Sequence, residues 1–147
     1  MKILLAIDDS KFSEAATNAI LTFAKPKETE VRAIHVVEPP APPIGAQDWG
    51  QIPIYVEILK EERARANDVV RRTAETLRAA GFNASFTVAD GSPKTEILQE
   101  ASNWRADLIV VGSHGRRGLD KFLLGSVSEA VARHARCSVL IVRLPAN

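Results

Sequence analysis

The sequence predicts an α/β fold: a single Rossmann-like domain in which a five-stranded parallel sheet lies between two layers of helices. Five short apolar runs alternate with helical stretches along the chain. Ile, Leu and Val fill the first, fourth and fifth runs with little alternation, as in parallel strands that helices cover on both faces. The length of 147 residues suits one core and predicts one domain over residues 1–147. We therefore expect a three-layer sandwich with strand order 3-2-1-4-5.

Residues that start or stop helices divide the chain between these runs. Ser10 can cap a first helix that extends to about Lys25, where Pro26 stops it. A long second helix begins near Ile54 and ends near Gly81. We expect the strands at Lys2–Ile7, Val31–Val37, Ala84–Ala89, Leu108–Gly112 and Val139–Val142.

The last two helices have start signals of their own. Ser92 precedes Pro93, which is a capping serine followed by the residue favoured at the first helical position. Ser126 starts the fourth helix, and its spacing from Glu129 is that of a capping box. Both signals therefore predict helices that begin immediately after a strand and a loop.

The second helix carries charges of both signs. Glu61 and Arg65, like Asp68 and Arg72, are spaced by four residues, which supports a helix. This pattern predicts a solvated face rather than a nucleic-acid surface. The connection before this helix, from Glu38 to about Pro53, is long and rich in proline. It is either a binding loop or a disordered crossover, and the sequence does not separate the two.

Composition and charge exclude several classes of protein. Nineteen basic and eighteen acidic residues give a net charge of +1, so no general field draws the chain to nucleic acid or to a membrane. The single cysteine, Cys137, excludes an intramolecular disulfide and is expected to be a small core residue. His35, His114 and His134 lack the spacing of a helical zinc pair. No apolar run has the length of a signal segment or a membrane span, which predicts a cytoplasmic protein.

A glycine-rich loop follows the fourth predicted strand. Gly112 and Gly115 begin it, and Gly125 precedes Ser126 at the start of the fourth helix. Glycines let the backbone approach an anion and adopt positive φ, and a helix amino terminus offers free N–H groups and a positive dipole end. Arg116 adds positive charge, as do Arg117 and Lys121. Each glycine alone is explained by a turn, and Ser126 by capping, so it is their combination that predicts a phosphate-binding loop.

Asp8 follows the first strand and is expected to face this loop. In the predicted order the first and fourth strands are neighbours, and ligands bind where the strand order reverses. A carboxylate at that point can hold ribose hydroxyls or a phosphate-bound Mg²⁺. It can equally well cap the following helix together with Asp9 and Ser10. The sequence leaves these two roles open.

The spacing around the loop resembles the nucleotide-binding signature of the universal stress protein family, in its ATP-binding branch. Gly112-x-x-Gly115, nine further residues and Gly125-Ser126 carry this resemblance. The similarity covers the whole chain: Ile3–Ser10 resembles the family's opening strand and turn, Ile34–Val37 its second strand, and Gly125–Glu129 the start of its fourth helix. Asp9 stands where the family often has glycine, and Ser138 where it often has proline.

The resemblance implies a homodimer that binds ATP, or else ADP or AMP, in the crevice, with Mg²⁺ as a further ligand. It also implies a role in stress survival or metabolic regulation, with a protein partner that the sequence does not identify. Val36 would meet adenine through its backbone, and His114 would bond either to the nucleotide or to the backbone. The nucleotide-binding residues expected are Ala6, Asp8, Val36, Gly112, His114, Gly115, Arg116, Gly125, Ser126, Val127 and Ser128.

The sequence favours binding over turnover. The loop lacks the lysine of the G-x-x-x-x-G-K-[ST] motif, and the chain has no G-x-S-x-G elbow. Asp8 is the one carboxylate expected at the phosphates, so slow or negligible ATP hydrolysis is predicted. The alternatives are a slow ATP-hydrolysing or adenylating enzyme and an interaction module that works without nucleotide.

The last strand is expected at an edge of the sheet, where its unpaired backbone invites association. An antiparallel pairing of two such strands would give a closed two-fold dimer. The alternative is a helix or loop that covers the edge. The dimer interface predicted is Val139, Leu140, Ile141 and Val142.

Overall fold

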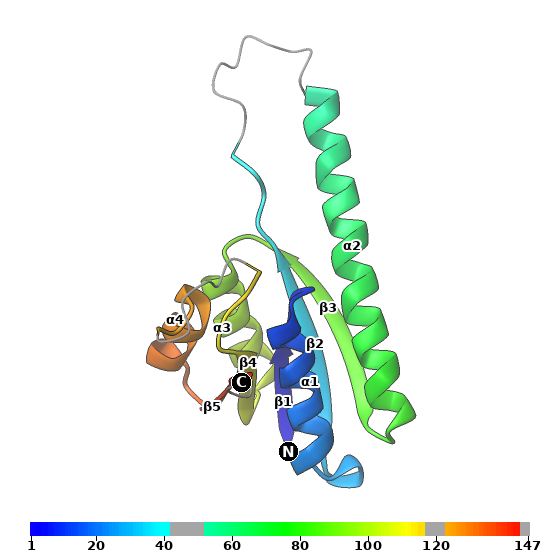
Figure 1. The fold of residues 1–147 in the computed structure, drawn as a ribbon, viewed down its shortest axis with the longest axis vertical. Coiled ribbons are helices and arrows are strands. Elements are labelled where there is room, and N and C mark those ends of the chain that lie inside the picture. The colour runs from blue at the N-terminus through cyan, green and yellow to red at the C-terminus, as the bar shows by residue number, and fades with distance from the viewer. Residues whose placement is uncertain (42–51, 117–122, 145–147) are drawn as a thin grey trace.

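A five-stranded parallel sheet forms the middle of the molecule (Figure 1). The structure is a computed structural model that describes residues 1–41, 52–116 and 123–144. The strand order β3-β2-β1-β4-β5 confirms the predicted order and places β1 beside β4. Each predicted strand is correct to within one residue at either end. The strands are β1 (Lys2–Ala6), β2 (Glu30–Val37), β3 (Asn83–Asp90), β4 (Leu108–Gly112) and β5 (Ser138–Val142).

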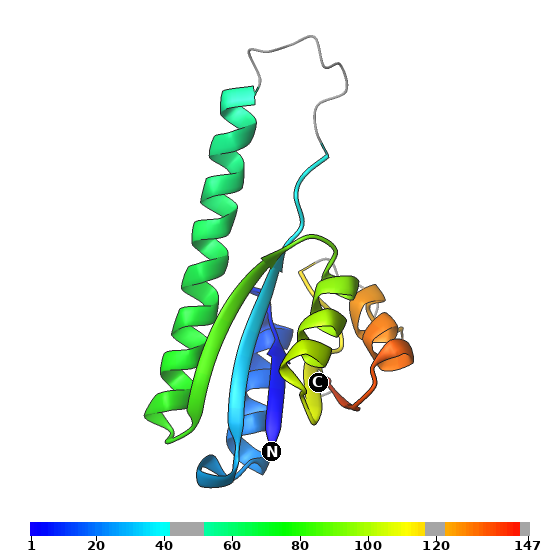
Figure 2. The same cartoon turned by 180° about the vertical axis from the view of Figure 1, so that it is seen from behind.

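Helices cover both faces of the sheet, which confirms the three-layer sandwich. Helix α1 lies in front of the sheet in Figure 1, and α3 lies in front of it in Figure 2, which views the molecule from behind. Helices α1 and α2 share one buried cluster, and α3 and α4 share the other. The helices are α1 (Lys11–Phe23), α2 (Ile52–Ala79), α3 (Pro93–Trp104) and α4 (Ser126–His134), with a short 3₁₀ helix at Pro26–Glu28.

Alternate side chains of β1 pack into the two hydrophobic clusters on opposite faces of the sheet. Ile3 and Leu5 are fully buried in the cluster of α1 and α2, whereas Leu4 is buried in that of α3 and α4. Successive side chains of a strand point to opposite faces, so a strand buried on both sides needs apolar residues at every position. This is why the first apolar run shows no alternation.

The end of α2 follows the glycine signal read from the sequence. Gly81 has a φ of +92°, a backbone conformation that glycine adopts without strain. Its N–H bonds to the carbonyl of Arg78 at 2.9 Å, and the N–H of Phe82 bonds to that of Leu77 at 3.1 Å. These two bonds form the Schellman arrangement that satisfies the last carbonyls of a helix. The predicted end near Gly81 is therefore confirmed.

Helix α4 begins at Ser126, as predicted, but its N-cap differs from the predicted capping box. Gly125, not Ser126, is the N-cap, with extended backbone at φ −63° and ψ 153°, and Ser126 is the first helical residue. The first helical hydrogen bond runs from the N–H of Glu129 to the carbonyl of Gly125 at 2.9 Å. The capping-box interpretation of Ser126 was therefore wrong by one residue. Ser10 and Ser92 are N-caps as predicted, although only Ser10 accepts a capping hydrogen bond within the described residues.

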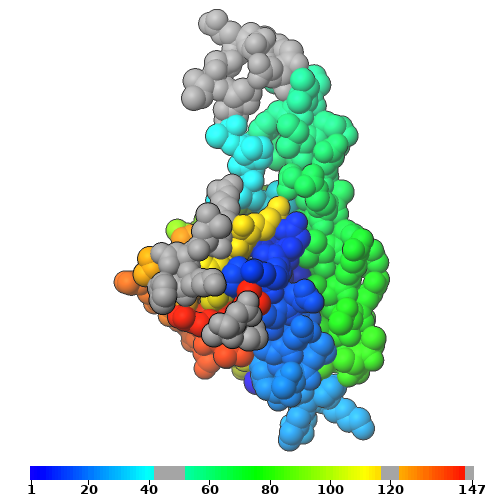
Figure 3. All heavy atoms as spheres, viewed as in Figure 1, coloured from blue at the N-terminus to red at the C-terminus, as the bar shows by residue number. Residues whose placement is uncertain are grey.

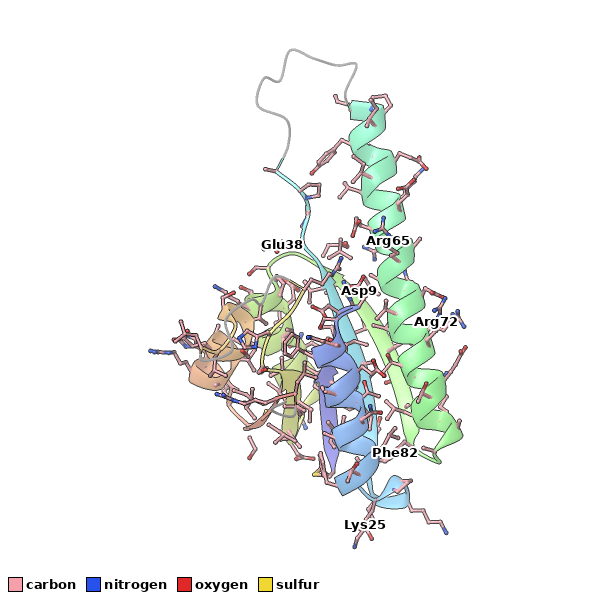
Figure 4. All side chains as sticks on the ribbon, in the orientation of Figure 1. Asp9, Lys25, Glu38, Arg65, Arg72 and Phe82 are labelled. Atoms are coloured by element: carbon pink, nitrogen blue, oxygen red, sulfur yellow. The ribbon has the colours of Figure 1, made fainter. Side chains whose placement is uncertain are left out.

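The first half of α2 rises beyond the carboxyl-terminal edge of the sheet (Figures 1 and 3). Its outer face carries the predicted mixed charges: Arg72 pairs with Asp68 at 2.7 Å and points away from the sheet in Figure 4. Arg65 pairs with Glu62 at 3.3 Å rather than with Glu61. No helix among residues 1–41, 52–116 and 123–144 is long and apolar enough to cross a membrane. The proline-rich stretch 42–51, with Trp49, lies outside the described residues.

Candidate functional site

A cavity of about 460 Å³ opens at the carboxyl-terminal edge of the sheet, where β1 and β4 meet. The strand order reverses at this point, which is where doubly wound sheets hold their ligands. All of the residues expected to bind nucleotide line it: Ala6, Asp8, Val36, Gly112, His114, Gly115, Arg116, Gly125, Ser126, Val127 and Ser128. The fold thus brings together residues of β1, β2, the loop after β4 and α4.

The glycines of the loop permit close packing rather than positive φ. A Cβ atom on Gly112 would lie 2.7 Å from the Cβ of Phe12, and one on Gly115 would lie 2.9 Å from Oδ2 of Asp8. On Gly125 it would lie 3.1 Å from the carbonyl oxygen of Ser113. None of the three has positive φ, so that part of the prediction was wrong. Close approach of the loop to α1 and to the start of α4 explains these glycines.

The loop is tied to α4 through Ser113. Its carbonyl oxygen accepts the N–H of Gly125 at 2.8 Å and lies 3.0 Å from Oγ of Ser128, a buried side chain. The first three N–H groups of α4 belong to Ser126, Val127 and Ser128, all of which line the cavity. The first turn of a helix has no intrahelical acceptor for such groups. With the positive end of the helix dipole, they form a suitable environment for an anion.

Asp8 links the turn after β1 to the loop. Oδ1 accepts hydrogen bonds from the N–H of Ser10 at 2.9 Å and from Oγ of Ser13 at 2.7 Å. Oδ2 accepts the N–H of Arg116 at 3.2 Å. Burial alone would raise the pKa of Asp8, but the hydrogen bonds from Ser10, Ser13 and Arg116 together lower it below its ordinary value. Asp8 is thus an ionised carboxylate that organises the start of α1 and faces the loop.

Two histidines contribute nitrogen atoms to the same region. His35 on β2 is buried, and its Nδ1 has no hydrogen-bond partner among the described residues. Burial, followed by the charge of Arg116, lowers the pKa of His35 and favours the neutral ring. His114 lies beside Phe12, with 5.2 Å between ring centroids, and its Nδ1 is 3.1 Å from Oγ of Ser113. Its Nε2 is buried and likewise unpartnered within the described part of the chain.

Sequence reasoning missed the part of the cavity formed by α1, α2 and α3 and by strand residues other than Ala6, Val36 and Gly112. The ring of His35 was discounted, and the carboxylates of Glu38 and Glu62 were not considered for the site. The position of Glu62 depends on how α2 passes over the sheet, which no local pattern encodes. Further residues that line the cavity are Ile7, Ser13, Ile34, Val37, Pro93, Ile97 and Val111.

The remaining sites expected or excluded by sequence reasoning lie elsewhere. β5 is at the edge of the sheet, as predicted, and pairs with β4. Its residues Val139 to Val142 are half-buried against the two cores.

Burial raises the pKa of Cys137, which packs against the α3 and α4 cluster. Among the described residues no group of three or more His, Cys, Asp or Glu side chains could hold a metal ion.

The fold and the cavity together define a doubly wound α/β protein of Rossmann type with a polar, glycine-lined site at its switch point. The family model for the universal stress protein family matches residues 1–143. The chain belongs to the universal stress protein family, as the resemblance of its loop indicated.

Individual relatives agree with this assignment over nearly the full length. Universal stress protein MJ0531 of Methanocaldococcus jannaschii is 38% identical, over 98% of this chain and 82% of that protein. The solved structure of the hypothetical protein MJ0577 has a TM-score of 0.83 at 27% identity and covers 99% of this chain and 97% of that one. A universal stress protein solved in complex with cAMP has a TM-score of 0.61 at 27% identity, with coverage of 97% and 96%.

Proposed function

We propose that this protein binds an adenine nucleotide at the switch point of its sheet, with ATP as the principal ligand and ADP or AMP as related ones. The observation that carries the proposal is the convergence of every residue expected to bind nucleotide on one cavity. A volume of about 460 Å³ is in the range of cavities that hold cofactor-sized ligands. The universal stress protein solved with cAMP supports an adenine nucleotide, because cAMP shares adenine and ribose with ATP.

The cavity offers different chemistry to each part of such a ligand. Ile34, Ile97 and Val111 give an apolar wall for a base beside Val36, whose backbone would bond to adenine. The loop Gly112–Arg116 and the amino terminus of α4 would receive the phosphates. Asp8 would take the ribose hydroxyls, since its Oδ2 accepts only one hydrogen bond among the described residues.

Asp8 is also the residue that would bind a Mg²⁺ ion carried by the phosphates of the nucleotide, either directly or through a water molecule. Mg²⁺ is commonly bound by one or two carboxylates together with phosphates and waters. A single ionised carboxylate beside the loop fits that pattern. The ion would supply positive charge to the phosphate groups.

The function we propose is that of a regulatory or stress-response switch with little ATP turnover. Among the described residues that line the cavity, Arg116 is the one lysine or arginine, so transition-state charge would be weakly stabilised. An unidentified partner protein would then read the bound nucleotide. The edge strand β5 would form a homodimer by antiparallel pairing through Val139 to Val142.

The first experiment is to denature freshly purified protein and identify the released nucleotide by mass spectrometry. The emptied protein is then titrated calorimetrically with Mg-ATP, ADP, AMP and cAMP, with GTP as the matched control for the base. We expect a stoichiometric adenine nucleotide or saturable rebinding, and much weaker binding of GTP. Absence of both would reject the nucleotide site and leave an interaction module. Turnover is measured by phosphate release, and a rate of about 1 s⁻¹ or more, the usual range of enzymes, would reject the switch in favour of an ATPase.

A further inference from the structure

We infer that Asp9 determines ligand specificity by competing with phosphate groups for Arg116, so that it weakens the binding of polyphosphates relative to uncharged nucleosides. The inference rests on the proposed function, because it concerns the same cavity. It assigns a role to a residue that does not itself line that cavity.

Two neighbouring carboxylates hold Arg116 from the turn after β1. Asp8 accepts the backbone N–H of Arg116 at 3.2 Å, and Oδ1 of Asp9 lies 2.6 Å from Nε of its guanidinium. Asp9 lies at the carboxyl-terminal edge of the sheet in Figure 4. Arg116 lines the cavity whereas Asp9 lies outside the lining. The carboxylate of Asp9, which lies outside the cavity lining, therefore neutralises the positive charge of Arg116 at the cavity wall.

The charges around the cavity make this neutralisation important. Besides Arg116, the described lining carries the carboxylates of Asp8, Glu38 and Glu62. An anionic ligand therefore meets mainly negative side chains in the described lining, where the guanidinium of Arg116 is the one arginine or lysine charge that offsets them. Each change in the availability of Arg116 alters affinity for phosphates and leaves the apolar wall for a base unchanged.

The pair is weak enough to exchange. The side chains of Arg116 and Asp9 are 46% and 44% exposed, and ion pairs at such exposure contribute little to stability. A phosphate chain carries several negative charges and accepts two parallel N–H bonds from a guanidinium. It would displace the single carboxylate of Asp9, and the lost pair would reduce the net affinity.

The test is calorimetric titration of wild type and Asp9→Asn with ATP and with adenosine, in EDTA and in Mg²⁺. We expect Asp9→Asn to bind ATP about threefold more tightly, as for loss of one exposed ion pair. Adenosine should bind both proteins equally. The gain should shrink at high salt, because screening weakens exposed pairs. Asp68→Asn is the matched control, since it removes another surface carboxylate paired with arginine, here Arg71 at 2.6 Å and Arg72 at 2.7 Å, on the outer face of α2.

Arg116→Gln separates competition from general repulsion. In that background Asp9→Asn should leave the Kd for ATP nearly unchanged; a persistent threefold gain would overturn the competition. Weaker ATP binding by Asp9→Asn in Mg²⁺ would also overturn it and identify Asp9 as a metal ligand. If neither wild type nor Asp9→Asn binds ATP, the proposed function and the inference both fail, whereas ATP binding with no effect of Asp9→Asn rejects the inference alone. Circular dichroism establishes that each variant is folded.

Discussion

Oδ2 of Asp8 accepts the backbone N–H of Arg116 at 3.2 Å, which joins the turn after β1 to the loop after β4. The other oxygen of the same carboxylate accepts hydrogen bonds from Ser10 and Ser13 at the start of α1. One side chain therefore fixes two segments that are 108 residues apart in the sequence. These hydrogen bonds hold the turn after β1 and the loop after β4 together at the edge of the cavity.

Asp8→Asn should lower the free energy of unfolding at pH 7 by about 1–3 kcal/mol. Asn has one acceptor oxygen, so its NH₂ group would face a donor that Asp8 now satisfies. The folded chain lowers the pKa of Asp8 from 3.8, so its stabilisation is present above that pH and is lost as pH falls through the folded pKa. The difference between the variant and wild type should therefore shrink below about pH 4.

Urea denaturation at several pH values between 7 and 2 measures this difference. Glu57→Gln, on the exposed start of α2, is the control for loss of one carboxylate. A difference between Asp8→Asn and wild type that stays constant down to pH 2 would show that the hydrogen-bonded charge of Asp8 is not its source.

Gly115→Ala should destabilise the fold by about 1 kcal/mol and should do so through Asp8. The added Cβ would lie 2.9 Å from Oδ2 of Asp8, too close for an unshifted side chain. The cost should fall in an Asp8→Ala background, where that oxygen is absent. Gly112→Ala is the matched control, because its Cβ would meet the backbone carbonyl carbon of Phe12 at 3.0 Å, which no change at Asp8 relieves. Thermal unfolding of the single and double variants measures the coupling, and equal costs in both backgrounds would contradict it.

Local sequence signals predicted the helices and strands, whereas contacts between segments distant in the sequence determine the details of the site. Gly81 could be predicted as a helix end because its conformational role depends on neighbouring residues only. Gly112 and Gly115 could be assigned to the loop, but their packing against Phe12 and Asp8 could not, since those contacts join distant segments. Ser126 was wrongly predicted to be the N-cap, which is Gly125, one residue earlier. Glycine also serves as an N-cap, but it has no side chain that would identify this role in the sequence.

The cavity itself was partly predictable for a topological reason. In a parallel sheet the carboxyl ends of all strands lie at one edge, so the topology places Asp8, Val36 and Gly112 together there. Glu62 reaches the cavity from α2, whose length and path beyond the sheet depend on helix packing. His35 was weighed only as a zinc ligand and rejected on spacing, and an isolated histidine in an apolar strand gives no sign of facing a cavity.

Ser126→Asp should weaken ATP binding by about tenfold and leave the fold at least as stable. An acidic residue in the first turn of a helix interacts favourably with the helix dipole, so α4 should gain a few tenths of a kcal/mol. The same charge would repel phosphates received at that terminus. Ser126→Asn is the matched control of similar size without charge. Calorimetry with ATP and thermal unfolding should show opposite effects of the aspartate, and unchanged ATP affinity would exclude phosphates from this terminus.

Leu140→Asp should convert the proposed dimer to a monomer. Leu140 lies on β5 at the sheet edge and packs partly against the α1 and α2 cluster, so the variant introduces charge beside the paired backbone. Ile141→Lys makes a matched change on the opposite face, where Ile141 packs against the α3 and α4 cluster. Light scattering over a range of concentrations gives the mass, and circular dichroism establishes folding. If both folded variants retain a dimeric mass, the dimer forms through another surface; Phe86→Asp on β3, the opposite edge strand, then tests that edge, because its ring is 38% exposed.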